Sequence, residues 1–160
     1  MKPPNFVMNC FKPLKEKFKF FDTLNGIGLM TFTVIVTETN GFILFKNQRQ
    51  LICYSGYDII ENQSGAKPRK TRMLKKGNTH IRRILHMSAF SAVNNNVTVF
   101  RNLYERVYDR ASIKMKGYVA VQRKLLVTMY FLWKKDEAFD PNFKTSGNQE
   151  TKSLFSVVKI

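Results

Sequence analysis

The apolar positions in the C-terminal half of the chain recur at helical spacing in three segments. The first covers residues 79–94, and Asn78 or Thr79 is suited to cap its N-terminus. We also predict helices over 97–109 and 118–133, separated by a basic turn at Ser112–Gly117. The inward positions of the three helices are Ile81, Ile84, Leu85, Ser88 and Ala92; Val99, Phe100, Leu103, Tyr104 and Val107; and Val119, Gln122, Leu125, Leu126, Met129 and Trp133.

A glycine turn, Gly26-Ile27-Gly28, opens the N-terminal half and leads into the apolar run Leu29–Thr37. The β-branched and aromatic residues of this run favour a strand. A turn of this kind is also typical of a helix-hairpin-helix, in which backbone N–H groups of the second helix hold a DNA phosphate. The turn alone favours neither interpretation. For the whole chain we expect the helical form, with Gly26 and Gly28 among the nucleic-acid contacts.

The chain then breaks at Asn40-Gly41, and a short amphipathic helix is predicted over Lys46–Tyr54, with Gly56 as its left-handed end. Residues 57–78 are polar and have no regular period. Their breakers are Ser64-Gly65, Pro68 and Gly77-Asn78. A loop of this length indicates function rather than connection. The predicted fold is therefore mainly α: a helix-hairpin-helix, a long basic loop and a three-helix C-terminal bundle.

The net charge of the chain indicates the class of its partner. The 160 residues contain 27 Lys and Arg against 11 Asp and Glu, a formal charge of +16 that fits one domain with an anionic partner. No carboxylate stands between Ser64 and Glu105. We predict that nucleic acid is bound by the cations of this stretch: Lys67, Arg69, Lys70, Arg72, Lys75, Lys76, Arg82 and Arg83.

Other classes of function fit the sequence less well. A peripheral membrane protein would carry its cations on a long amphipathic helix, not in a loop broken by glycine and proline. No run has the length of a membrane-spanning helix, and the N-terminus lacks a secretory pattern, so we expect a cytoplasmic protein. Cys10, Cys53, His80 and His86 have no metal-ligand spacing, and we predict no metal site in this chain.

Ser64 is the candidate for covalent chemistry. Beside Gly65 its hydroxyl is sterically accessible, and the cations that follow would neutralise a phosphate under attack. A Ser-Gly pair is more often a plain turn, in which case the basic run is a solvated grip on phosphates. The sequence leaves both interpretations open at this point.

An ordered set of motifs goes further. In chain order they are TLNGIG (23–28), FKNQRQL (45–51), YSG (54–56), SG (64–65), KKGN (75–78), IRRIL (81–85), FRNLY (100–104) and VAVQRKLL (119–126). Over about residues 22–143 this set resembles the C-terminal transposase domain of the insertion-sequence transposases described as bridge-RNA-guided recombinases. Its specificity lies in the order of the pieces.

The resemblance implies a role for several residues. In that family the nucleophilic serine lies in a Ser-Gly eight residues after the glycine of a Tyr-(Ala/Ser)-Gly, and Gly56 and Ser64 have that spacing. Ser55, the rival serine, is expected to pack at a helix end. The family also implies DNA and a guide RNA as partners, a homo-oligomer, and Mg²⁺ held by the acidic residues of a separate N-terminal RuvC-like domain, with no cofactor bound by this part.

Two departures shape the prediction. The family usually has Gly-Leu-x-Pro after the Tyr-x-Gly, whereas this chain has Gly56-Tyr57-Asp58-Ile59. The acidic N-terminal domain is also not in the sequence, so we expect a truncated transposase fragment that is inactive alone. We divide it into an irregular leader (1–21), the transposase C-terminal domain (22–143) and a flexible tail (144–160). The alternative function is a non-enzymatic nucleic-acid-binding module that retains the fold.

Overall fold

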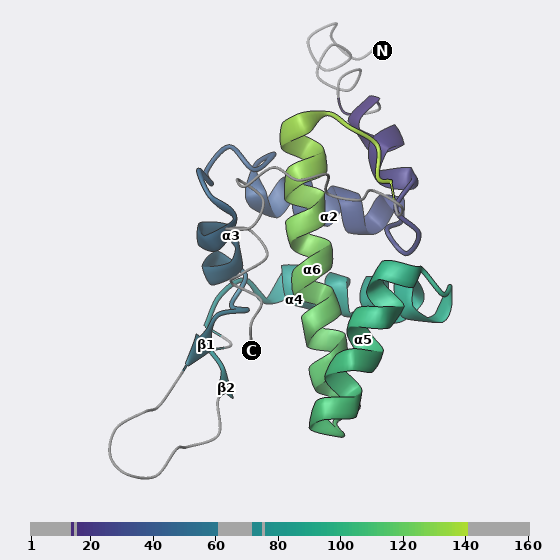
Figure 1. Ribbon diagram of the computed structural model, residues 1–160. Coiled ribbons are helices and arrows are strands. Elements are labelled where there is room, and N and C mark those ends of the chain that lie inside the picture. The colour runs from purple at the N-terminus through teal and green to yellow at the C-terminus, as the bar shows by residue number, and fades with distance from the viewer. Residues whose placement is uncertain (1–13, 15, 61–71, 75, 141–160) are drawn as a thin grey trace, which may run out of the picture.

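The computed structural model describes residues 14, 16–60, 72–74 and 76–140 and confirms the mainly helical class (Figure 1). A helical segment over residues 16–22 precedes the labelled elements. These are α2 (Leu29–Thr39), α3 (Gln48–Tyr54), β1 (Ile59–Ile60), β2 (Arg72–Met73), α4 (Thr79–Asn94), α5 (Thr98–Ala111) and α6 (Lys114–Lys135). None of the helices in the described residues has the length and apolar character needed to cross a membrane.

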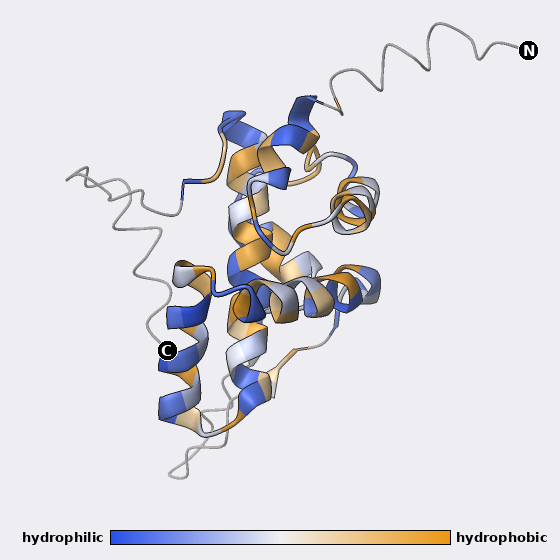
Figure 2. Ribbon diagram, turned by 90° about the vertical axis from the view of Figure 1, so that its right-hand side faces the viewer, coloured by the Kyte–Doolittle hydropathy of each residue, from blue (hydrophilic) through white to orange (hydrophobic). Residues whose placement is uncertain are grey.

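The long helix α6 lies at the centre of the fold and contacts α3, α4 and α5 (Figure 1). Its core positions include Val121, Leu125, Leu126 and Met129, all fully buried. Removing each such side chain from water contributes about 1.5–3 kcal/mol. By contrast, α5 is largely hydrophilic (Figure 2), and only its Phe100 is buried. The helix α5 therefore covers one side of α6, and most of the surface of α5 faces solvent.

The helix α6 begins earlier than the sequence predicts, so the basic turn expected at 112–117 is wrong. Only Ser112, with φ of 52°, turns the chain, and residues 114–117 form the first turn of α6. Gly117 has the character of a helix breaker in the sequence. It is instead buried in the helix, where an added β-carbon would lie 2.7 Å from the Tyr104 ring. Close approach of α5 and α6 explains this glycine.

The run after the glycine turn is the helix α2, so the strand interpretation is wrong there. Its buried residues Thr31, Phe32, Ile35 and Thr39 lie on one helical face. Packing of this face outweighs the weak strand preference of β-branched residues. Thr39 Oγ1 also donates to the carbonyl of Ile35 at 2.6 Å, which satisfies a buried hydroxyl. Asn40 and Gly41, both at positive φ, end the helix as predicted.

An aromatic cluster joins the N-terminal helical segment to the C-terminal end of α6. The rings of Phe21 and Phe32 lie 5.0 Å apart, and that of Phe42 lies 5.8 Å from Trp133. Lys17 Nζ lies 4.5 Å above the Trp133 ring and 2.7 Å from Asp136 Oδ1. Residues 16–22 are thus part of the packed structure.

The helix α4 spans Thr79–Asn94, as the sequence predicts, and its N-cap is Asn78. The predicted loop of residues 57–78 needs correction, because its two ends form the antiparallel strands β1 and β2. Two-residue strands give no detectable alternation in the sequence, which explains why the pattern missed them.

Candidate nucleic-acid interface

The predicted basic loop begins and ends at the small antiparallel pair of β1 and β2. We call residues 61–71, which connect the two strands, the basic segment. Ile59 pairs with Met73 and Ile60 with Arg72, and the N–H of Leu74 donates to the carbonyl of Asp58 at 2.8 Å. Five predicted site residues lie outside the described residues: Ser64, Lys67, Arg69, Lys70 and Lys75. Of Arg72 only the backbone is described. The structure therefore describes the two ends of the predicted loop, and we call residues 54–58, 72–74 and 76–78 the segment base.

Two glycines allow the two halves of the segment base to touch. A β-carbon on Gly77, whose φ is 153°, would lie 2.5 Å from the carbonyl oxygen of Tyr54 and 2.6 Å from the amide nitrogen of Gly56. These contacts are with backbone atoms, which cannot move aside as a side chain can. One residue further on, the N–H of Asn78 donates to the same Tyr54 carbonyl at 2.9 Å. Only glycine fits at position 77.

Asn78 connects the segment base to two helices. Its side-chain oxygen accepts from the N–H groups of His80 at 2.9 Å and Ile81 at 3.2 Å, which caps α4. Its side-chain nitrogen donates to Glu38 Oε2 in α2 at 2.6 Å and to the Tyr54 hydroxyl at 3.3 Å. The cap thus occupies two of the free N–H groups at the start of α4 and fixes that helix against α2.

The predicted contacts Lys76, Arg82 and Arg83 are the ones whose side chains the structure describes. Lys76 and Arg83 are exposed at the segment base and in the first turns of α4, where they can meet an anion. Arg82 is half-buried, and its Nη1 donates to the carbonyl of Ser55 at 2.9 Å. Arg82 therefore ties α4 to the end of α3 in addition to any contact of its other nitrogens.

The glycine turn lies far from these cations. Gly26, with φ of 105°, packs on the other half of α4, where an added β-carbon would lie 2.9 Å from the Ser88 carbonyl. The Thr31 and Ser88 hydroxyls are 2.8 Å apart, so α2 runs antiparallel to α4. Ten residues of α4 therefore separate the turn from Asn78, about 15 Å. Gly28 is exposed and precedes α2 in extended conformation, with φ of −88°.

The helix α6 adds a cation that the sequence analysis missed. Arg123 is half-buried; desolvation lowers the pKa of its guanidinium, and the Asp58 carboxylate at the segment base opposes that change. Arg123 thus lies near β1, although 65 residues separate it from Asp58 in the sequence. The one signal in the sequence was the pair of cations, Arg123 and Lys124, between the core positions Gln122 and Leu125 of an apolar helix.

A chain of hydrogen-bonded side chains connects the segment base to α6 and α4. The Tyr57 hydroxyl donates to Gln122 Oε1 at 2.9 Å, and Gln122 Nε2 lies 3.1 Å from His86 Nδ1. Burial raises the pKa of Tyr57 well above its ordinary value, an effect that the charge of Arg82 partly offsets. Tyr57 therefore remains a neutral donor at physiological pH, and His86 takes part in positioning Gln122.

Ser55 packs at the end of α3, as the sequence predicts. It is fully buried, and its hydroxyl has no hydrogen-bond partner in the described part of the chain. Across the same part, no group of three or more His, Cys, Asp and Glu side chains is arranged to hold a metal ion.

Curated relatives resemble most of this chain. The pilin gene-inverting protein of Moraxella bovis is 24% identical over 135 residues, which cover 84% of this chain and 42% of that protein. The pilin gene-inverting protein of Moraxella lacunata matches with the same identity and coverage. The chain thus spans less than half the length of these relatives.

A family profile matches the segment that holds most of the site, including the segment base and α4. The match covers residues 19–105, which include the glycine turn, the segment base, α4 and the first half of α5. More than half of the chain is therefore accounted for by one family, and the ordered motifs of the sequence lie mostly within it. By this match, the chain belongs to the transposase family IS116/IS110/IS902.

Proposed function

We propose that this chain is a DNA-binding domain of a transposase or recombinase, with the basic segment and its base as the DNA-contacting surface. The observation that carries the proposal is the exposure of Lys76 in the segment base and of Arg83 in the adjoining α4. Gly77, Asn78 and Arg82 fix the segment base against the neighbouring helices. Cations on a rigid frame hold a phosphate backbone in one register, as strand exchange requires. The relatives' name supports the proposal, because inverting a gene requires cutting and rejoining DNA.

Within this function, Ser64 is the proposed nucleophile. Its Oγ attacks a backbone phosphorus, the Oγ–P bond replaces one P–O bond of the strand, and the displaced oxygen leaves as a free hydroxyl. The serine proton passes to a base and the leaving oxygen gains a proton, so the number of phosphodiester bonds is unchanged and the strand can be rejoined. The cations that follow Ser64 in the sequence stabilise the charge that develops on the phosphate.

The remaining parts of the proposal come from the family resemblance. A separate acidic domain supplies Mg²⁺ to neutralise the attacked phosphate, a guide RNA is a second nucleic-acid partner, and the intact protein is a homo-oligomer. In this proposal the residues of this chain bind DNA but do not cut it by themselves, because the metal comes from the acidic domain.

The test is a strand-transfer assay in which an intact homologous N-terminal domain is supplied in trans. We expect covalent protein–DNA product with the wild-type chain and none with Ser64→Ala. Ser55→Ala is the matched control, because this serine is buried and is expected to leave the product unchanged. Product formation that survives Ser64→Ala removes this serine from the mechanism.

The second candidate is a nucleic-acid-binding module without catalysis. The exposed cations Lys76 and Arg83 favour it, because they can hold phosphates without any catalytic group. It predicts binding that weakens steeply with salt, and no strand transfer even with the acidic domain present. The same assay distinguishes the two functions.

A further inference from the structure

A row of aromatic rings crosses the surface formed by α4, α5 and α6. Phe90 lies 5.8 Å from Tyr118, Tyr118 lies 4.7 Å from Tyr104, and Tyr104 lies 6.0 Å from Tyr108, measured between ring centroids. We call these four residues the aromatic row. The rings of Tyr104 and Tyr108 are parallel to within 2°. Three helices thus contribute to one continuous band of rings.

The aromatic row is not covered by the described rest of the chain. Phe90 is 47% exposed and Tyr108 is 37% exposed, at the two ends of the row, while Tyr104 and Tyr118 are half-buried. Rings that serve only the core are buried, as Phe21 and Phe32 are in the same protein. Because Gly117 leaves room for it, the Tyr104 ring lies directly against the backbone of α6.

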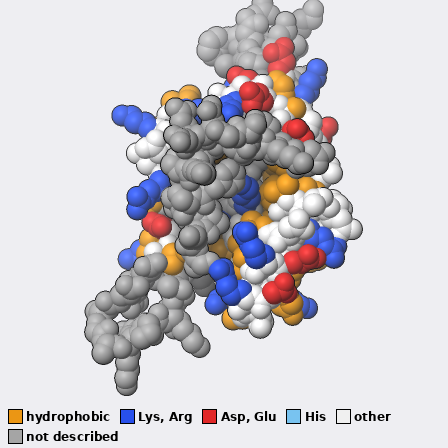
Figure 3. Space-filling model, in the orientation of Figure 1, with side chains coloured by type: hydrophobic (Ala, Val, Ile, Leu, Met, Phe, Trp, Pro, Cys, Tyr) orange, Lys and Arg blue, Asp and Glu red, His pale blue; other side chains and the backbone are white. Residues whose placement is uncertain are grey.

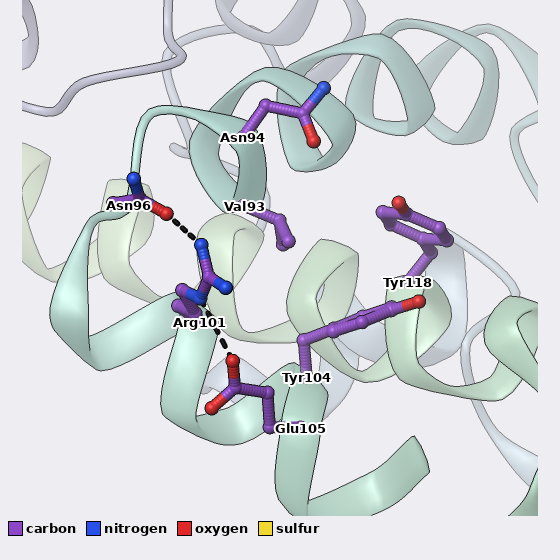
Figure 4. Close-up of a pocket in the computed structure, with 7 residues that line it drawn as sticks. All are labelled: Val93, Asn94, Asn96, Arg101, Tyr104, Glu105 and Tyr118. Atoms are coloured by element: carbon purple, nitrogen blue, oxygen red, sulfur yellow. Dashed lines mark hydrogen bonds and ion pairs between the residues drawn. The ribbon is translucent and has the colours of Figure 1, made fainter.

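A pocket of about 320 Å³ adjoins the middle of the row (Figure 4). Tyr104 and Tyr118 form one side, and the amides of Asn94 and Asn96 lie at its rim. Arg101, which donates to Glu105 at 2.8 Å and to Asn96, forms another side. Flat aromatic surface next to amide donors and acceptors suits a planar heterocycle with polar edges.

The charges around the row favour an anionic chain. Five cations stand on residues 98–118, against the two carboxylates Glu105 and Asp109; they are Arg101, Arg106, Arg110, Lys114 and Lys116. Burial raises the pKa of the Tyr118 hydroxyl above its ordinary value, and the charge of nearby Lys114 partly offsets this increase. On the face shown in Figure 3, Lys and Arg side chains mix with acidic ones over α5 and the start of α6.

We propose that the aromatic row and its pocket bind unstacked bases of single-stranded nucleic acid. Bases stack on the rings, the asparagine amides contact base edges, and the surrounding cations follow the phosphates. This inference deepens the proposed function and rests on it, since it assigns a second, separate nucleic-acid surface. A duplex offers no unstacked bases, so the row selects single strands, whereas the cations of the segment base act on duplex and single strand alike.

The test uses the full chain and fluorescence anisotropy with short labelled single strands of DNA and of RNA, and with the matching duplex, at one salt concentration. We expect Phe90→Ala and Tyr108→Ala each to weaken single-strand binding by roughly 5- to 150-fold and to leave duplex binding unchanged. The DNA and RNA arms show which single strand is preferred. Phe90→Tyr and Tyr108→Phe keep the rings and are expected to bind as the wild type does.

Met87→Ala and Ile113→Ala are matched controls, because these apolar side chains are 64% and 48% exposed in the same region and belong to no ring contact of the row. Equal losses on single strand and duplex, or wild-type binding by both ring-deletion variants, overturn the inference. A change of oligomeric state with unchanged single-strand binding also overturns it and assigns the row to self-association. If the wild type binds no nucleic acid at all, the proposed function fails as well.

Discussion

Arg82 donates from Nη1 to the backbone carbonyl of Ser55 at 2.9 Å, and so joins the first turn of α4 to the end of α3. A guanidinium predicted to meet DNA thus has a structural role at the segment base. Both roles are compatible, because the side chain has five N–H donors.

Replacement of Arg82 tests the structural role. We expect Arg82→Ala to lower the free energy of unfolding by about 1.5–3 kcal/mol, the range for a hydrogen bond to a charged group. The measurement is urea unfolding followed by circular dichroism. Arg83→Ala, on an exposed neighbour, is the control and should change stability by less than about 0.5 kcal/mol. Equal effects of the two would show that the bond from Arg82 to Ser55 does not stabilise the fold.

Gly77 is the position least able to accept a side chain. An added β-carbon meets backbone atoms at 2.5 and 2.6 Å, so we expect Gly77→Ala to destabilise the fold by about 3 kcal/mol. Gly28→Ala is the control, because nothing lies within 4 Å of its β-carbon position. The melting temperature of each variant gives the answer, and a stable Gly77→Ala would contradict the close contact between the two halves of the segment base.

Ser55→Ala separates packing from chemistry. The buried hydroxyl has no partner in the described part of the chain, so its removal is expected to leave stability unchanged or to raise it by up to about 1 kcal/mol. Thermal unfolding measures the change. A loss of stability of more than about 1 kcal/mol would reveal a hydrogen bond to the Ser55 hydroxyl.

The buried Tyr57 predicts how stability depends on alkaline pH. Burial raises the pKa of its hydroxyl above the ordinary value of 10.0, so the folded state keeps the proton while the unfolded state releases it. The contribution to stability is complete below pH 10 and is lost as pH rises above it. Urea midpoints measured from about pH 9 to about pH 11 should fall less steeply for Tyr57→Phe than for the wild type. Parallel slopes would place Tyr57 in contact with water.

Salt dependence measures the phosphate contacts. We expect Lys76→Ala and Arg83→Ala each to reduce the slope of log affinity for duplex DNA against log salt by about 0.9, the value for one phosphate contact. Lys135→Ala is the control, because this exposed lysine is the last residue of α6, whereas α6 contacts the segment base at Gln122. An identical slope for all variants would exclude Lys76 and Arg83 from the interface.

Local patterns predicted local structure well. The spacing of Ile81, Leu85 and Ser88 indicated the bounds of α4, and Asn78 was among the expected caps. Such features depend on neighbours within one or two turns. Gly56, at φ of 73°, follows α3 in the left-handed conformation, as predicted, because a helix end also depends only on nearby residues.

Relations between distant segments were beyond the sequence. The antiparallel course of α2 and α4 separates Gly26 from Arg83, although both were predicted to contact nucleic acid. The Asp58 carboxylate acts on the Arg123 guanidinium only because α6 packs against the segment base, where Gln122 accepts from the Tyr57 hydroxyl. The close contacts at Gly77 and Gly117 likewise depend on packing, and a single sequence shows each of them only as a glycine.

The central position of α6 has a consequence for how the protein can be divided. The family match ends at residue 105, before the helix that contacts α3, α4 and α5. A polypeptide trimmed to the matched residues would lack α6, whose buried Val121 and Leu125 belong to the same hydrophobic core as Leu85 and Phe100. The residues that match the family are therefore fewer than the residues that the fold requires, because the fold also needs α6.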